Sequence, residues 1–294
     1  MAQILKGRMK LLTKESWEYN PNTQEKIDLK REAQLRKESI KFMMSLGVES
    51  LHLPLSTVQK AIVIFQRYCQ NISFKNFDRF LLGTVSILLM AKDDYHQRRL
   101  EDTIKSFLIV AQKMKLQQFN KYVDPNRLDT KEQQDAFLQK LGPKAITMHH
   151  ENFQNAEIEI LQMSGYDLVV EVTSKYLDIF KRKYTGVTDR VVFQDLIKLA
   201  EENTNTIYMS NLCLYYHPMI LTVIAIQAAA EKLNVNLPNI QAESNEQKQE
   251  DDDFGDIDIP AQQVEWWQMF SKRIQKEDIN DCMKYYQDFV KLLN

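Results

Sequence analysis

Glycine and proline are scarce in this chain, with only 7 of each among 294 residues. This is less than half the frequency of the two residues in an average protein. Turns with positive φ, tight hairpins and phosphate-cradling loops all depend on glycine. The chain therefore lacks the material for a β-sandwich, a barrel or a glycine-rich nucleotide site, and an all-α fold is predicted.

The remaining composition narrows the class of protein. Hydrophobic residues make up 44 % of the chain, enough to form the core of one large domain or of two smaller ones. The net charge is −2, so the chain is no polycation and direct nucleic-acid binding is not expected. Three widely separated cysteines, Cys69, Cys213 and Cys282, fit buried reduced thiols.

The sequence also bears on where in the cell the protein is located. The first residues lack an apolar region long enough for a signal peptide. The longest apolar stretches have about 12 residues, too few to cross a bilayer. We therefore expect a protein of the cytosol or nucleus, with no membrane partner.

Apolar residues recur at three- and four-residue spacing through most of the chain, which predicts amphipathic helices. The predicted helices cover residues 23–46, 57–71, 80–91, 100–116, 151–163, 171–183, 188–209, 218–233, 264–271 and 278–293. Two of them, 80–91 and 218–233, are apolar on nearly every side, as is typical of a helix at the centre of a helical domain. Each comes about third in its half of the chain, which indicates a duplicated all-α domain.

Two segments interrupt this pattern. Residues 117–148 are polar and contain Pro125 and Pro143, and we interpret them as a long loop with at most a short helix. Residues 240–260 carry eight acids against Lys248 alone, which predicts an acidic loop.

The motifs of most enzyme classes are missing. No two glycines are close enough for a dinucleotide or P-loop motif. His149, His150 and Glu151 are adjacent and lack the four-residue spacing that places two metal ligands on one helix face. Carboxylates are too evenly spread to single out an acid–base pair. We therefore predict no catalytic residue, metal or cofactor.

One region resembles a known family. Residues 61–104 resemble, without a gap, the first cyclin box of the transcription-type cyclins (C, K, L and T). The resemblance rests on Arg67-Tyr68, Ser73-Phe74-Lys75, Phe77, Arg79-Phe80, Leu88 to Lys92 and Arg98-Arg99-Leu100. Further matches are Glu157, Leu161-Gln162, the corner Gly165 to Leu168, Leu212 to Tyr215 with Pro218, and Trp266-Trp267 with Phe270.

The resemblance implies two tandem five-helix cyclin boxes preceded by an N-terminal arm. The arm would cover residues 1–22 and the first box residues 23–167, including the loop 117–148. The second box would cover residues 168–294, including the acidic loop 240–260. This division also explains the duplicated helical pattern.

The resemblance further implies a function. Cyclins are regulatory subunits, not enzymes: they bind a cyclin-dependent kinase beside its mobile C-helix and favour its active conformation. We expect a nuclear heterodimer with a Ser/Thr kinase acting in transcription, on the RNA polymerase II tail, and a larger transcription complex is a further expected partner. By resemblance, Lys92 and Glu157 form the central polar pair of the kinase interface, and Leu88, Asp94 and Tyr166 are contact positions.

Some positions depart from the family pattern. After the lysine the family usually has an apolar residue and two glutamates, whereas this chain has Asp93, Asp94 and Tyr95. The substrate-docking motif of cell-cycle cyclins is replaced by Phe42-Met43-Met44. Two alternatives therefore remain open: a cyclin-box scaffold that activates no kinase, and a cyclin-fold general transcription factor that grips DNA, against which the charge weighs.

Overall fold

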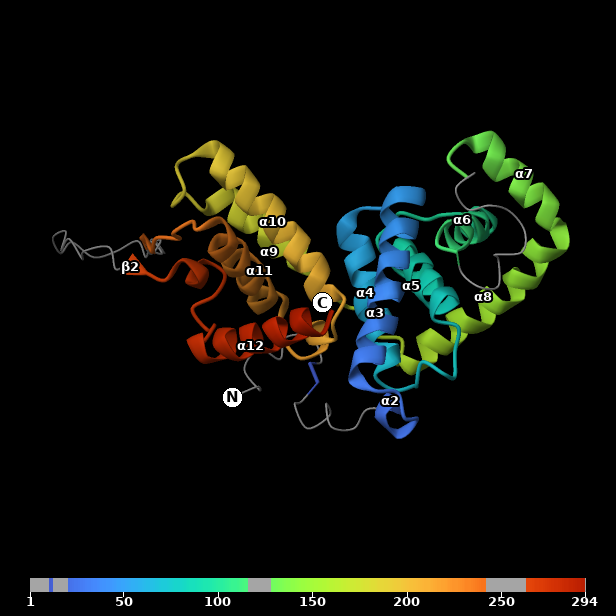
Figure 1. Ribbon diagram of the computed structural model, residues 1–294, viewed down its shortest axis with the longest axis horizontal. Helices are drawn as coiled ribbons and strands as arrows, with labels where there is room; N and C mark the ends of the chain where they lie inside the picture. Colours follow the sequence, from blue (N-terminus) through green and yellow to red (C-terminus); the bar gives the residue numbers. More distant parts are fainter. Residues whose placement is uncertain (1–10, 13–20, 116–127, 242–262, 294) are drawn as a thin grey trace, which may run out of the picture.

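The computed structural model describes residues 11–12, 21–115, 128–241 and 263–293, and they form two helical halves that lie side by side (Figure 1). The all-α prediction is confirmed apart from one antiparallel pair of two-residue strands. Most of the predicted arm lies outside the described residues, although the Leu12 N–H donates to Leu214 O at 2.8 Å.

The first half contains α2 to α8. Their bounds are α2 Pro21–Gln24, α3 Leu29–Met44, the π-helical turn η1 Ser45–Ser50, α4 Leu55–Cys69, α5 Arg79–Asp93, α6 Leu100–Lys113, α7 Lys131–Leu141 and α8 Pro143–Met163. At its centre lies α5, which packs against α3, α4, α6 and α8. The residues of α5 from Leu82 to Ala91 are all buried, as its uniformly apolar sequence predicts.

The second half contains α9 to α12. Their bounds are α9 Thr173–Lys183, α10 Arg190–Tyr208, the 3₁₀ turn η3 Leu212–Leu214, α11 Pro218–Leu233, β1 Ile240–Gln241, β2 Gln263–Val264, the 3₁₀ turn η4 Trp266–Met269 and α12 Lys276–Leu293. Its central helix is α11, which contacts α9, α10 and α12. The predicted duplication around two buried central helices is therefore confirmed.

Side chains at the helix ends explain where several elements begin. Asp78 accepts hydrogen bonds from the N–H groups of Phe80 and Leu81, and Asp189 caps α10 in the same way. Each carboxylate satisfies backbone donors that have no partner within the helix and lies at its positive end.

The prediction of a loop over 117–148 is wrong for its described part. Residues 131–141 form α7, and α8 begins at Pro143 rather than at Glu151. The loop prediction treats Pro143 as a helix breaker. At the first position of a helix, however, proline loses no hydrogen bond, and its fixed φ already suits the helix. A capping box between Thr130 and Gln133 starts α7, and this was the available sequence signal.

Two further predictions need correction or lie outside the description. The helix predicted over 264–271 is only the short turn η4, preceded by β2. Of the predicted acidic loop 240–260, residues 242–260 lie outside the described residues. Their two ends meet as β1 and β2, where Ile240 pairs with Val264.

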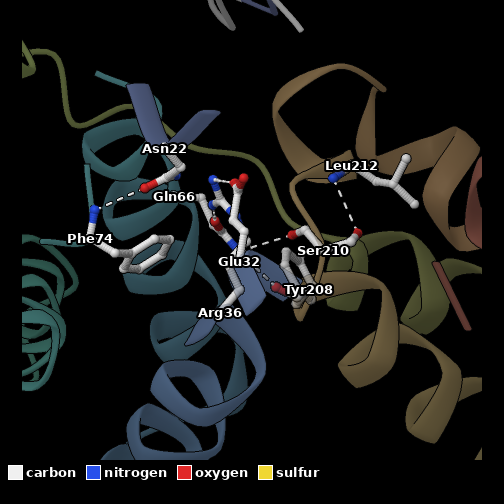
Figure 2. A network of polar contacts seen from close by, with 8 residues as sticks. All are labelled: Asn22, Glu32, Arg36, Gln66, Phe74, Tyr208, Ser210 and Leu212. Atoms are coloured by element: carbon white, nitrogen blue, oxygen red, sulfur yellow. Dashed lines mark hydrogen bonds and ion pairs between the residues drawn. The ribbon is translucent and has the colours of Figure 1, made fainter. Parts of the chain in front are cut away.

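A buried polar network joins the two halves (Figure 2). Arg36 of α3 pairs with Glu32 at 2.7 Å and donates to the side-chain oxygen of Gln66 on α4. The amide nitrogen of Gln66 in turn donates to two backbone carbonyls of the second half, Tyr208 O at 3.2 Å and Ser210 O at 2.9 Å. The relative position of the halves is thus tied to side chains that water does not reach.

A second glutamine repeats this arrangement. Gln59 lies seven residues before Gln66, two turns away on the same face of α4. Its side-chain oxygen accepts hydrogen bonds from the Ser174 N–H at 3.3 Å and from the Thr173 hydroxyl at 3.5 Å. Helix α4 therefore supplies both a donor and an acceptor to the backbone of the second half.

Candidate protein-interaction site

Lys92 and Glu157, 65 residues apart in sequence, form an ion pair between α5 and α8. The Lys92 Nζ lies 2.5 Å from the Glu157 Oε1. Lys92 is in the last turn of α5, where a cation also complements the helix dipole. The two side chains remain 45 % and 23 % exposed, so the pair lies at the surface and is accessible to a partner.

Leu88 lies one turn before Lys92 on α5 and is only 3 % exposed. It therefore offers little surface to a partner in this conformation, and its role as a contact stays a prediction. Helix α5 packs against α3, α4, α6 and α8.

Asp94, the last of the predicted contacts on α5, is held by the chain itself. Its carboxylate accepts hydrogen bonds from the Thr57 hydroxyl at 2.7 Å and from Lys60 at 2.5 Å, both on α4. These bonds anchor the end of α5 to α4. A partner that uses Asp94 must share or displace them.

Tyr166 is 70 % exposed and lies just after the end of α8. The tight corner that carries it is closed by a hydrogen bond from the Tyr166 N–H to Leu161 O at 2.9 Å. Arg67 of α4 supports the same corner with a hydrogen bond to Val169 O at 3.4 Å. Burial lowers the pKa of Arg67, and the nearby Asp167 works in the opposite direction.

Exposed apolar side chains are concentrated in the sequence just after Glu157. The large apolar side chains of 36 % exposure or more among the described residues are Leu29, Tyr95, Met148, Ile158, Met163, Tyr166, Val169, Val191, Leu233 and Leu292. Four of these ten lie within residues 158–169, directly after Glu157, and Tyr95 follows Lys92 by three positions. A polar pair with clustered apolar neighbours is typical of a protein-binding surface.

In the sequence, Tyr95 stands out only as a departure from a family pattern. The sequence does not predict that its side chain is 92 % exposed. The sequence signal was an aromatic residue placed directly after the polar end of a buried helix. Lys60 was also missed, since nothing near it in sequence indicates that it pairs with Asp94.

No group of three or more potential metal ligands lies together in the described part of the chain. The three cysteines are buried, and burial raises the pKa of both Cys69 and Cys213 to about 12, so these thiols stay protonated and unreactive. Among the helices that the structure describes, none is long and apolar enough to cross a membrane.

No family model matches the chain. It is 29 % identical over 227 residues to Cyclin-T1-5 of Arabidopsis thaliana, a match that covers 77 % of this chain and 35 % of the relative. It is 25 % identical over 211 residues to human Cyclin-K, covering 72 % of this chain and 31 % of the relative. The chain thus spans about a third of the length of these relatives.

A fission yeast relative and a solved structure extend the comparison. The chain is 25 % identical over 227 residues to Cyclin pch1 of Schizosaccharomyces pombe, covering 77 % of this chain and 59 % of the relative. Its fold matches a chain of the yeast RNA Pol II CTD kinase complex CTDK-1 with a TM-score of 0.64 and 14 % identity, covering 96 % of this chain and 73 % of that one. The chain is thus similar in sequence to cyclins of the T and K types and similar in fold to a chain of the CTDK-1 complex.

Proposed function

We propose that this chain is a regulatory subunit that binds a cyclin-dependent Ser/Thr kinase through the surface around Lys92 and Glu157 and activates it in transcription. The cross-helix ion pair carries the proposal, because it lies at the surface next to a concentration of exposed apolar side chains. A charged pair that a partner covers is costly to disrupt, since each remaining charge would be buried alone. The division into boxes at 23–167 and 168–294 is part of the proposal.

The substrate and cellular setting follow from the same comparison. The similar proteins include T- and K-type cyclins, and the fold matches a chain of a kinase complex named for the RNA polymerase II tail. We therefore propose the polymerase tail as substrate, the nucleus as location and a larger transcription complex as setting. The substrate, the location and the larger complex are proposed for the whole protein.

The experiment begins with the protein recovered from its own cells. Co-purifying proteins are identified by mass spectrometry, and kinase activity is measured on a polymerase-tail peptide. We expect a cyclin-dependent kinase to be recovered and to phosphorylate the peptide only in the presence of this chain.

The interface is tested with Lys92→Glu, Glu157→Lys and the double variant. Each reverses a charge at the centre of the proposed contact, so kinase binding should weaken by about tenfold or more for the single variants. Lys181→Glu is the matched control, because Lys181 also pairs across two helices, with Glu201 at 2.8 Å, on the second half. Unchanged binding by all three interface variants would mean that the kinase contacts another surface.

A second candidate function is a cyclin-box scaffold that binds partners but activates no kinase. It is favoured by Asp94, whose carboxylate is already bound by Thr57 and Lys60. This alternative predicts a stable complex without any gain in phosphorylation of the tail peptide, which the same activity assay measures.

A further inference from the structure

Two tyrosines are the most exposed large apolar side chains in the described part of the chain. Tyr95 is 92 % exposed and Tyr166 is 70 % exposed. Neither ring forms a hydrogen bond or a ring contact with another described residue. A single exposed apolar residue is ordinary, but these two also share an unusual backbone conformation.

Both tyrosines adopt the left-handed conformation, with φ of 60° for Tyr95 and 61° for Tyr166. This region is unfavourable for residues other than glycine, because Cβ approaches the following carbonyl oxygen. The other described residues with positive φ are Lys26, His52, Lys115, Asn234 and the glycines Gly142 and Gly165. The two tyrosines are thus the only ones with a phenyl ring.

Each tyrosine belongs to the same kind of helix terminus. After α5, the Tyr95 N–H donates to Lys92 O at 3.3 Å and the His96 N–H to Ala91 O at 2.8 Å. After α8, the Gly165 N–H donates to Gln162 O at 3.1 Å and the Tyr166 N–H to Leu161 O at 2.9 Å. These paired bonds are the Schellman arrangement that ends many helices.

The hydrogen bonds that close each helix terminus fix the backbone at the tyrosine, and therefore the direction of its Cα–Cβ bond. Once the backbone is fixed, a tyrosine has only two side-chain torsions to order, so little entropy is lost when a partner covers it. An aromatic ring with a polar tip is also among the residues that contribute most to protein interfaces. The two rings are therefore preorganised for contact and are not loose ends of a loop.

Both tyrosines lie close in sequence to a member of the Lys92–Glu157 ion pair. Tyr95 follows Lys92 by three residues, and Tyr166 follows Glu157 by nine. From Glu157 to the end of α8 at Met163 is about 9 Å along the helix, and Tyr166 lies three residues further on. A standard interface covers about 800 Å² on each partner, which is roughly 30 Å across. One partner can therefore cover both rings together with the ion pair.

We propose that Tyr95 and Tyr166 are a pair of preorganised aromatic anchors that determine which kinase this chain binds. The proposal rests on the proposed function, because the partner is the kinase that covers the ion pair. The partner surface should offer two apolar recesses near a polar group that meets Lys92 and Glu157. Beside Tyr95 it should offer a basic group, because Asp93 is exposed there.

The test uses glycine substitutions in the full chain and the recombinant kinase identified by the recovery experiment above. Tyr95→Gly and Tyr166→Gly remove the rings and place at each position a residue that tolerates the left-handed backbone. We expect each to bind the kinase about tenfold more weakly or worse. The midpoint of thermal unfolding should stay unchanged or rise, whereas a purely structural role would lower it.

Two controls separate the ring from the backbone. Asn234→Gly changes another left-handed residue, at the end of α11 on the second half, and should leave kinase binding unchanged. Tyr95→Phe keeps the ring and should retain most of the binding. If Tyr95→Gly does not fold, Tyr95→Asn replaces it, because asparagine also tolerates this conformation.

The outcomes distinguish this inference from the proposed function. Wild-type binding by both glycine variants, together with weak binding by Lys92→Glu, would overturn the role of the tyrosines and leave the kinase interface intact. Wild-type binding by Lys92→Glu, Glu157→Lys and both glycine variants would overturn both. Loss of binding with loss of folding in Tyr95→Gly and Tyr95→Asn would also overturn the inference, since it would assign the ring a structural role.

Discussion

At the scale of single residues, His217 combines a structural role with a titratable group. Its Nδ1 accepts a hydrogen bond from the Met219 N–H at 3.2 Å and caps α11, the central helix of the second half. Nδ1 must be unprotonated to accept this bond. Burial lowers the pKa of His217, although Glu171 works to raise it and Lys175 lowers it further.

The pH dependence of stability follows from this direction. Because the pKa is lower in the folded chain, the unfolded chain binds the proton more readily, and the free energy of unfolding should fall as pH drops below about 6.5. Burial also lowers the pKa of His149, which acts in the same direction. His217→Asn keeps an acceptor at the cap without a titrating group, so its stability should fall less from neutral pH to about pH 5.5.

The measurement is urea unfolding at a series of pH values. The free energy of unfolding should fall less from neutral pH to about pH 5.5 for the variant than for the wild type. Identical pH slopes for the two proteins would show that His217 is not a source of the dependence.

Asp94 shows at the same scale how a residue's role depends on its neighbours in space. Its position after Lys92 suggested a contact with a partner. In the structure, Thr57 and Lys60 of α4 already donate hydrogen bonds to its carboxylate. The sequence could place the acid at the end of the helix, but it could not reveal that Lys60, 34 residues earlier, lies within reach.

At the scale of elements, the contact between η1 and α4 is unusually close. A Cβ atom placed on Gly47 would lie 2.6 Å from Val58 Cγ2, too close for two carbons. Valine is stiff about its first side-chain torsion and cannot move aside easily. The glycine therefore lets the end of α3 and the start of α4 approach each other.

Gly47→Ala should lower the free energy of unfolding by about 1–3 kcal/mol, because the added methyl overpacks the contact. Val58→Ala should also destabilise the chain, through lost apolar contacts. The double variant should be more stable than the sum of the two predicts, since the new methyl occupies space that the valine leaves. Urea unfolding of all four proteins measures this coupling, and strictly additive effects would contradict the packing argument.

Helices α7 and α8 show which elements the sequence could and could not reveal. The buried helices were predicted because their apolar residues repeat with the helical period. In α7 only Phe137 is buried, so the periodic signal is nearly absent. Its capping residues remained the only indication, and such signals predict a boundary better than a whole element.

At the scale of the whole molecule, the two halves are held together by more than apolar packing. Gln66 uses both ends of its amide, accepting from Arg36 and donating to Tyr208 O and Ser210 O. The C-terminal helix α12 also packs against α3 of the first half. The surface around Lys92 and Glu157 belongs to the first half. The second half can therefore influence this surface only through contacts that join the two halves, such as those of Gln66 and α12.

Gln66→Leu should lower the free energy of unfolding by about 1–3 kcal/mol, because two buried carbonyls lose their donor. Hydrogen exchange at residues 212–216 should also become faster, since the hydrogen bonds of Gln66 to Tyr208 O and Ser210 O hold the backbone directly before that turn. Gln34→Leu is the matched control, because Gln34 lies on the exposed side of α3 and bonds only to Glu38 in the structure described. Unchanged stability and exchange in Gln66→Leu would show that apolar contacts alone fix the two halves.

The sequence by itself determined the class of this protein. Scarce glycine and proline, helical periodicity and two uniformly apolar segments were sufficient to predict an all-α fold with a duplicated core, since these properties depend on local conformation and on burial. Only the tertiary structure decided that Leu88 is buried, that Asp94 is bound by α4 and that Tyr95 and Tyr166 stand exposed at two helix ends. The contacts of Asp94 join residues 37 and 34 positions apart in sequence, and no local pattern encodes such contacts.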